Sequence, residues 1–159
     1  MPVLDARRPA VTLGGVIWSL LSAAAPAAAP GDPLPACPGT PNCVCSEPGA
    51  PDGRRVDPLP IGEGDAPGDP AAAWAALKRA VSRAGGTIKQ DAKAGDDCVL
   101  HAVVKTPVLR FPDDLLARLN GAAGVIHVRS SSRVGRSDLG ANRRRVEKLR
   151  AHYLEELNR

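Results

Sequence analysis

The segment that joins the last predicted strand to the last predicted helix carries side chains suited to holding an anion. It is polar, contains two glycines and ends where a helix begins. Unpaired amides and the helix dipole favour negative charge at such a start. Arginine adds forked donors that match phosphate and carboxylate. The candidate ligand-binding residues are Arg129, Ser130, Ser132, Arg133, Ser137, Asp138, Asn142 and Arg143.

The arginines of this segment also have a purely structural interpretation. They could form internal ion pairs with three aspartates, Asp113, Asp114 and Asp138. The two interpretations are compatible, because one arginine can pair internally while its neighbour meets a ligand. Both stay open at this point.

Asp113 and Asp114 form the pair of carboxylates that could serve an enzyme, as a general base or as ligands for a hard cation. Two aspartates after a proline are more commonly turn and capping residues. No nucleophile, triad or established metal motif accompanies them. A hydrolase or metal-dependent enzyme is therefore the alternative hypothesis, and we assign no catalytic residue, no cofactor and no metal.

Four cysteines, Cys37, Cys43, Cys45 and Cys98, allow three complete disulfide pairings. An even number favours disulfides in an oxidising compartment. A zinc site built from these thiolates and His101 is the alternative, because zinc accepts sulfur and nitrogen ligands. The spacing of Cys37 and Cys43 is looser than in the usual zinc knuckle, so we prefer disulfides.

Two helices are expected to position these side chains. Asp69 followed by Pro70 is typical of a helix start, and apolar residues at helical spacing continue to residue 84. A second apolar stripe runs from Leu139 to Leu157 and predicts a long C-terminal helix. Asp138 is the predicted N-cap of this helix.

Strands are expected between the helices. Alternating side chains predict strands over residues 87–91 and 98–105, joined by a turn, and over residues 125–130. Residues 108–111 are expected to continue extended. Residues 112–121 are ambiguous, because local propensity slightly favours a helix while apolar residues also alternate there as in a strand.

The predicted fold class is α+β. An antiparallel sheet of about four strands carries the N-terminal helix and the long C-terminal helix, both packed on one face. This domain is expected to span residues 69–159. Since aromatic residues make up only 3% of the chain, its core must consist mainly of Leu, Val, Ile and Ala.

Residues 1–27 have the features of a cleavable signal peptide. Arg7 and Arg8 precede an apolar run over residues 11–21, and residues 25–27 supply the small side chains that a signal peptidase reads. A twin-arginine signal and a lipid on Cys37 are weaker alternatives. Residues 28–68 are rich in Pro, Gly, Ala and Asp without a period, which predicts an irregular arm. We therefore expect an exported protein, periplasmic or secreted.

The charge distribution indicates what kind of partner to expect. The formal net charge is only +4, which does not indicate nucleic acid. Basic residues crowd the final third of the chain, however, so an anionic partner would meet that end. An anionic small molecule or an envelope component fits this pattern, and peripheral membrane contact fits it as well.

Three stretches together resemble one known family. They are CPGTPNCV at residues 37–44, RFPDD at residues 110–114 and VIHVRSSSRVGRSDLGANR at residues 125–143. In these motifs the chain resembles the family called domain of unknown function 1499, over Cys37 to about Arg150. The resemblance implies export or membrane association and no activity. It also implies a strand rather than a helix over residues 114–119.

The resemblance further informs the cysteines. Cys37 and Cys43 lie in the shared motif, where Pro and Gly turn residues can bring them within bridging distance, so we pair them. Cys45 and Cys98 are not expected from the family, so we pair them with each other. Our first functional hypothesis is a non-catalytic envelope protein that binds an anionic small molecule or surface through Arg129 to Arg143. A structural or assembly role is a further alternative.

Overall fold

The computed structural model describes residues 28–62, 68–107 and 109–159. The signal-peptide prediction for residues 1–27 lies outside the described residues. Within those described ranges, no helix is long and apolar enough to cross a membrane.

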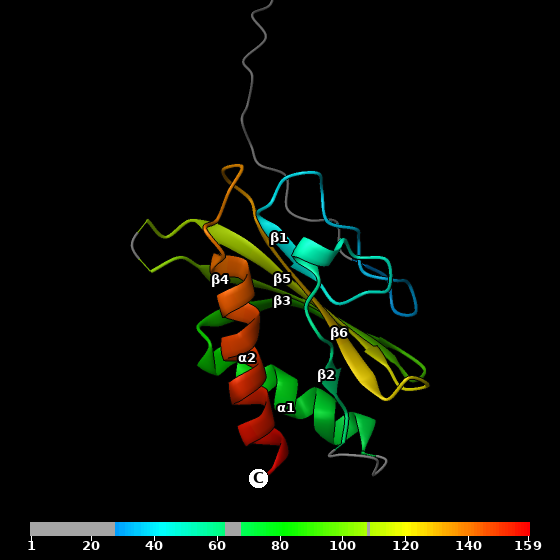
Figure 1. Cartoon of the computed structure of the whole chain (residues 1–159). Coiled ribbons are helices and arrows are strands. Elements are labelled where there is room, and N and C mark those ends of the chain that lie inside the picture. Colours follow the sequence, from blue (N-terminus) through cyan, green and yellow to red (C-terminus); the bar gives the residue numbers. More distant parts are fainter. Residues whose placement is uncertain (1–27, 63–67, 108) are drawn as a thin grey trace, which may run out of the picture.

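The fold is α+β, with more strands than the four expected. The elements in chain order are β1 (Cys43–Cys45), the 3-10 helix η1 (Asp52–Arg54), β2 (Leu59–Pro60), α1 (Pro70–Arg83), β3 (Gly86–Ala94), β4 (Asp97–Lys105), β5 (Pro112–Asn120), β6 (Val125–Ser132) and α2 (Ala141–Leu157). Six strands form one antiparallel sheet in the order β1-β6-β5-β4-β3, and β2 also pairs with β6 (Figure 1).

The two additional strands come from the Pro/Gly-rich segment that was predicted to be irregular. β1 and β2 pair with β6, and their apolar side chains Val44 and Leu59 are buried in the main core. Val56 and Ile61 from the same segment join them there. Strands of two or three residues are too short to show a period, which is why composition alone did not reveal them.

Residues 112–120 form strand β5, as the family resemblance implied, so the local preference for a helix is wrong. β5 lies between β4 and β6, and both of its faces are buried. Leu115 and Leu119 face the main core, whereas Leu116 packs on the opposite face against Val99. The packing of a central strand overrides weak local propensity.

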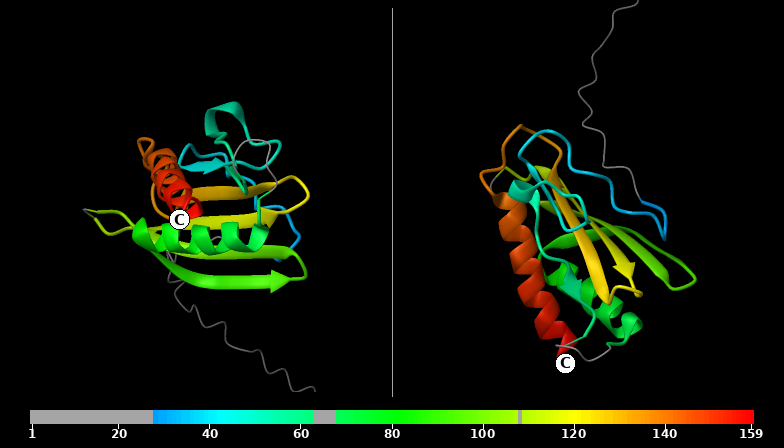
Figure 2. Two further views of the ribbon diagram at one scale, coloured as in Figure 1. Left: turned by 90° about the horizontal axis from the view of Figure 1, so that it is seen from below. Right: turned by 45° about the vertical axis from the view of Figure 1, so that its right-hand side comes forward.

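Both helices lie on one face of the sheet (Figures 1 and 2). α1 begins as predicted, with Pro70 in its first turn and the Asp69 side chain accepting a hydrogen bond from the Ala71 amide at 2.9 Å. Trp74 of α1 and Tyr153 of α2 are buried between the helices and the sheet. Burying these two large side chains offsets the scarcity of aromatic residues elsewhere in the core.

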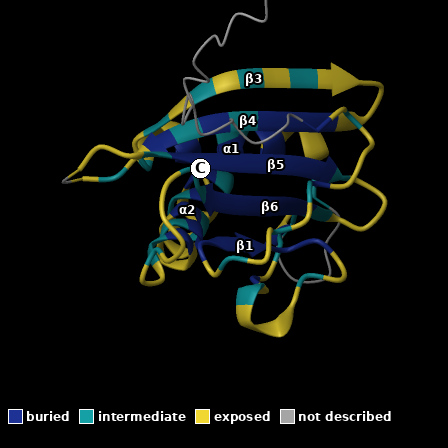
Figure 3. Cartoon of the chain, turned by 90° about the horizontal axis from the view of Figure 1, so that it is seen from above, coloured by how far each residue is buried: buried dark blue, intermediate teal, exposed yellow. Residues whose placement is uncertain are grey.

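The other face of the sheet, called the helix-free face below, is also covered. Ala28 and Leu34 pack there against Val99 of β4 and Leu116 of β5. β4, β5 and β6 are accordingly buried along most of their length (Figure 3). The Pro/Gly-rich segment therefore covers side chains of β4 and β5 that point away from the main core.

Two loops lie at the same end of the sheet, because the start of β5 pairs with the end of β6 (Figure 3). Residues 106–111 join β4 to β5, and residues 133–140 join β6 to α2. The expectation of extended backbone up to Phe111 is wrong. The Thr106 amide donates to the Phe111 carbonyl at 2.9 Å and the Arg110 amide to the Thr106 carbonyl at 3.1 Å, which closes a tight loop.

Candidate functional site

Asn142, in the first turn of α2, is the centre of a buried hydrogen-bond network. Its Nδ2, which carries two hydrogens, lies within hydrogen-bond distance of three acceptors: Ser132 Oγ at 2.9 Å, Asp138 Oδ2 at 2.7 Å and the Asn42 carbonyl at 3.0 Å. Its Oδ1 accepts from Ser130 Oγ at 2.6 Å. Three of the predicted site residues therefore surround a fourth, and all four hold the β6–α2 connection in shape.

The prediction that Asp138 is the N-cap of α2 is wrong, because the helix begins two residues later than predicted, but the Asp138 side chain still binds amides of the helix start. The N-cap position belongs to Gly140, and the Asp138 carboxylate accepts from the Gly140 amide at 3.0 Å and from the Asn142 amide at 2.8 Å. Burial raises the pKa of Asp138, but these hydrogen bonds outweigh it and lower the pKa below its ordinary value. The Gly140 and Asn142 amides at the helix start are therefore bound to the Asp138 carboxylate of the same chain.

Arg133 forms a forked ion pair with Asp114. Its Nε and Nη2 donate to the two carboxylate oxygens at 3.0 and 2.6 Å. His101 Nε2 lies 2.7 Å from Asp114 Oδ1 on the same face of the sheet. For Arg133 the structural interpretation is therefore correct.

Asp113 pairs with Arg145 of α2, an arginine that the sequence analysis did not single out. Asp113 and Asp114 are consecutive in β5, so their side chains point to opposite faces. They cannot share a cation or act as an acid–base pair on one substrate. The signal for Arg145 was its spacing from Asn142, which places both on one side of the helix.

Arg129 is almost fully buried, with 5% of its surface exposed, on the helix-free face of β6. Its Nη1 donates to Ser131 Oγ at 2.8 Å, and its buried Nε has no hydrogen-bond partner among the described residues. Burial lowers the pKa of this guanidinium. The predicted pairing of Arg129 with an aspartate is not formed at hydrogen-bond distance.

The remaining cations of this region are exposed. Arg143 donates to the Gly53 carbonyl at 3.3 Å and Arg144 to the Leu139 carbonyl at 2.9 Å. Arg136 is exposed as well, and so is Ser137, whose Oγ accepts from the Leu139 amide at 3.4 Å. In the described part of the chain, none of these three arginines has a carboxylate partner within salt-bridge distance.

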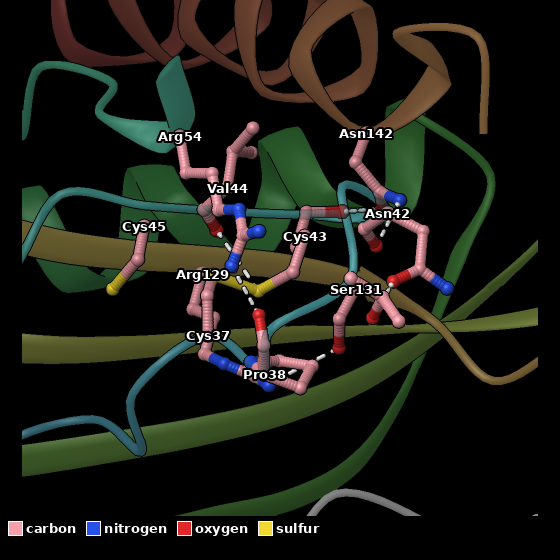
Figure 4. Close-up of a disulfide and its surroundings, with 12 residues drawn as sticks. Cys37, Pro38, Asn42, Cys43, Val44, Cys45, Arg54, Arg129, Ser131 and Asn142 are labelled. Carbon is pink, nitrogen blue, oxygen red and sulfur yellow. Dashed lines mark hydrogen bonds between the residues drawn. A yellow bond between two sulfur atoms is a disulfide. The ribbon is translucent and has the colours of Figure 1, made fainter. Parts of the chain in front are cut away.

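The Cys37–Cys43 disulfide is present, as predicted (Figure 4). Its loop is fastened to the candidate site through Asn42. The Asn42 side chain donates to the Gly135 carbonyl at 2.6 Å, and its own carbonyl accepts from the Ser132 amide at 3.0 Å. The disulfide therefore braces the loop that leads into α2.

The predicted pairing of Cys45 with Cys98 is wrong, since both are buried free thiols. Cys45 lies on the helix-free face beside Arg129, whereas Cys98 belongs to the main core. Strands β6 and β5 separate β1 from β4, so the two backbones are about 14 Å apart, beyond the reach of a disulfide. Burial raises the pKa of both thiols, which makes them poor nucleophiles.

The alternative zinc site is not assembled either. Cys98 and His101 point to opposite faces of β4. Across residues 28–62, 68–107 and 109–159, no group of three or more His, Cys, Asp or Glu side chains is arranged to hold a metal ion.

A second polar cluster on the helix-free face was not predicted. Glu47 accepts from Arg118 Nε and Nη2, both at 2.8 Å, and from the Leu34 amide at 3.0 Å, and His127 Nε2 lies 3.9 Å away. These side chains line a cavity of about 500 Å³ beneath residues 33–37 and 47–51. No sequence signal marked Glu47, because its partner lies 71 residues away in the chain.

Comparison with known proteins adds one finding. A family model with the description "Protein of unknown function (DUF1499)" matches residues 33–152, which include every predicted ligand-binding residue. Neither the curated proteins nor the solved structures contain a match.

Proposed function

Since the chain belongs to the DUF1499 family, whose description assigns no activity, we propose from its site that it is a non-catalytic exported protein that binds an anionic partner. The binding region is the exposed part of the segment from Arg129 to Arg143, together with Arg144 in the first turn of α2. An envelope component or a small anionic molecule is the expected ligand.

The observation that carries this proposal is the division of the arginines into two groups. Arg133 and Arg145 are neutralised by Asp114 and Asp113 inside the fold. The exposed group, Arg136, Arg143 and Arg144, has no carboxylate partner in the described part of the chain. Its guanidinium groups keep donors for phosphate or carboxylate oxygens.

The buried hydrogen-bond network supports the same proposal because it fixes the conformation of the loop between β6 and α2. Asn142, Asp138 and Ser132 fix the path between β6 and α2, and the disulfide loop adds a contact at Gly135. A prearranged site loses less conformational entropy when it binds a ligand. These predicted site residues therefore position the donors instead of contacting the ligand.

A non-catalytic role is supported by the arrangement of the acids. Asp113 and Asp114 face opposite sides of the sheet and each is held by an arginine. Arg133 and His101 occupy the oxygen atoms of Asp114, which leaves little room for a substrate proton there. The hydrolase hypothesis needs at least one of these carboxylates to be accessible to a substrate, and both are almost fully buried, so the geometry favours binding.

Titration of the protein with pyrophosphate and with citrate, followed by amide NMR, tests the proposal. We expect shifts concentrated in residues 133–144. Replacing Arg136 or Arg143 with alanine should weaken binding about fivefold each, the effect of losing one charged contact of about 1 kcal/mol. Lys89→Ala, an exposed cation at the other edge of the sheet, is the matched control. Shifts elsewhere, or equal affinity in all variants, would refute the site.

A further inference from the structure

The end of the molecule that carries the proposed anion-binding site also exposes apolar side chains. Among the described residues, five large hydrophobic side chains are exposed, and four of them lie in the two loops at this end. Leu139 is 86% exposed and Leu109 67%. The full set in these loops is Leu109, Phe111, Val134 and Leu139. We call residues 105–107, 109–111 and 133–140, with the first turn of α2, the two-loop tip.

The backbone of the tip is left-handed at Leu139 and at Arg110, which lies between Leu109 and Phe111. Within the described ranges, only two residues other than glycine have positive φ, Arg110 at 53° and Leu139 at 50°. A left-handed leucine is unfavourable, and this one is the most exposed large hydrophobic residue. Leu139 therefore combines an unfavourable backbone conformation with a side chain that buries little surface within the protein, which is the pattern of a residue that contacts a partner.

The positive charge of the tip indicates what kind of partner it contacts. Lys105, Arg110 and Arg136 are exposed there, and Arg144 donates to the Leu139 carbonyl, which places a guanidinium at the base of the exposed leucine. The only acid of the tip is Asp138, whose carboxylate is engaged by the helix start. Apolar side chains surrounded by cations are the pattern of a surface that enters the headgroup region of an anionic bilayer.

We propose that the two-loop tip docks on an anionic lipid bilayer, with Leu109, Phe111, Val134 and Leu139 inserted among the headgroups and the surrounding arginines bound to lipid phosphates. The proposal rests on the proposed function and names its anionic partner. The loops project from the end of the sheet (Figures 1 and 3), which suits a fluid surface better than a rigid partner that would have to match two separate protrusions.

Co-sedimentation with vesicles tests the docking. The purified protein is mixed with vesicles of phosphatidylcholine alone or with one third phosphatidylglycerol, at low and high salt. We expect binding to the anionic vesicles only, weakened by salt because the tip charges are exposed. All variants below have the same N-terminus as the unchanged protein, so differences in vesicle binding between them report on the substituted side chains.

Leu139→Asn is the most informative variant, because asparagine tolerates a left-handed backbone that strains leucine. It should leave the urea midpoint unchanged or higher while weakening vesicle binding about fivefold. Adding Leu109→Ser should bring the loss to about twentyfold. Leu154→Ser, which removes an exposed leucine of α2 outside the tip, is the matched control and should bind as the unchanged protein does.

The outcomes separate this inference from the proposed function. Soluble pyrophosphate shifting residues 133–144 while vesicles are not bound would overturn the lipid docking and leave anion binding intact. Equal binding to neutral vesicles, or equal losses in Leu154→Ser and Leu139→Asn, would also overturn the docking. Vesicle binding that requires the tip leucines, without any response to soluble anions, would support the docking and refute the small-anion site.

Discussion

At the scale of single residues, Asn142 has the largest structural role in the candidate site. It joins β6, α2 and the disulfide loop through side-chain hydrogen bonds that water cannot replace, because the residue is fully buried. Truncation would leave several buried partners unsatisfied, and each such partner costs about 1–3 kcal/mol.

We therefore expect Asn142→Ala to lower the free energy of unfolding by about 3 kcal/mol, measured by urea denaturation. Arg143→Ala, the next residue along the helix, removes an exposed side chain with one long hydrogen bond and should change it by less than about 0.5 kcal/mol. A similar effect of both substitutions would show that the network does not hold the site.

The disulfide makes a second prediction at this scale. Cys37 and Cys43 are six residues apart, so their bridge restricts a short loop of the unfolded chain and stabilises the fold by about 2 kcal/mol. Cys37→Ser with Cys43→Ser should lose this stability and also weaken anion binding, because Asn42 then no longer braces Gly135. Non-reducing peptide mapping should find Cys37 linked to Cys43 and two free thiols; a link between Cys45 and Cys98 would contradict the structure.

Arginines show most clearly what the sequence could and could not reveal. Arg133 and Arg136 are three residues apart in the same polar loop, and nothing in their sequence context separates them. One faces Asp114 across the sheet and the other faces solvent, because the pairing of β5 with β6 brings a distant carboxylate beside only one of them. The sequence thus identified the cationic segment, whereas the division of roles depends on strand register.

At the scale of elements, the start of α2 couples the site to pH. The pKa of Asp138 is lowered in the folded protein, so its carboxylate contributes stability above the ordinary value of 3.8, and this contribution is lost as the pH falls through the lowered value. Asp138→Ala should cost about 1 kcal/mol at neutral pH through loss of the cap.

Asp138→Asn keeps an acceptor but does not titrate. The difference in unfolding free energy between the unchanged protein and this variant should therefore shrink as the pH falls from about 5 to about 2. Urea denaturation at several pH values measures it. A difference that stays constant with pH would show that the Asp138 carboxylate is not stabilised by its amide partners.

Elements were predictable where the sequence shows a clear period of apolar and polar residues, and less so where it does not. α1, α2, β3, β4 and β6 follow from apolar spacing, and their observed bounds differ from the expected ones by a few residues. β5 has buried side chains on both faces, and its sequence fits a helix as well as an alternating strand, so the family resemblance was needed to favour the strand. β1 and β2 depend on the edge of β6, which no local pattern can show.

At the scale of the whole molecule, the fold separates three regions. The helices pack on one face of the sheet, the Pro/Gly-rich segment covers the other, and one end carries the two-loop tip (Figure 2). This arrangement leaves the tip exposed while both faces of the sheet are occupied. Disulfides form and persist in oxidising compartments, so the Cys37–Cys43 bridge supports the proposed export.

Export predicts a defined N-terminus. Removal of the proposed signal peptide should leave a chain that begins at Ala28, which packs on the helix-free face. N-terminal sequencing and intact mass of the protein recovered from the periplasm or the medium measure this. Met1 at the N-terminus of the recovered protein, or a lipid on Cys37, would contradict the export proposal.

We propose above all that the two-loop tip is the surface that meets the anionic partner. Amide NMR of the protein with bilayer discs containing phosphatidylglycerol and a spin-labelled lipid tests this most directly, because the label weakens the signals of amides near the membrane. We predict signal loss confined to residues 105–111 and 133–144, with β3 and the C-terminal turns of α2 unaffected. Signal loss centred on β3 or on the end of α2, or none at all, would contradict the claim.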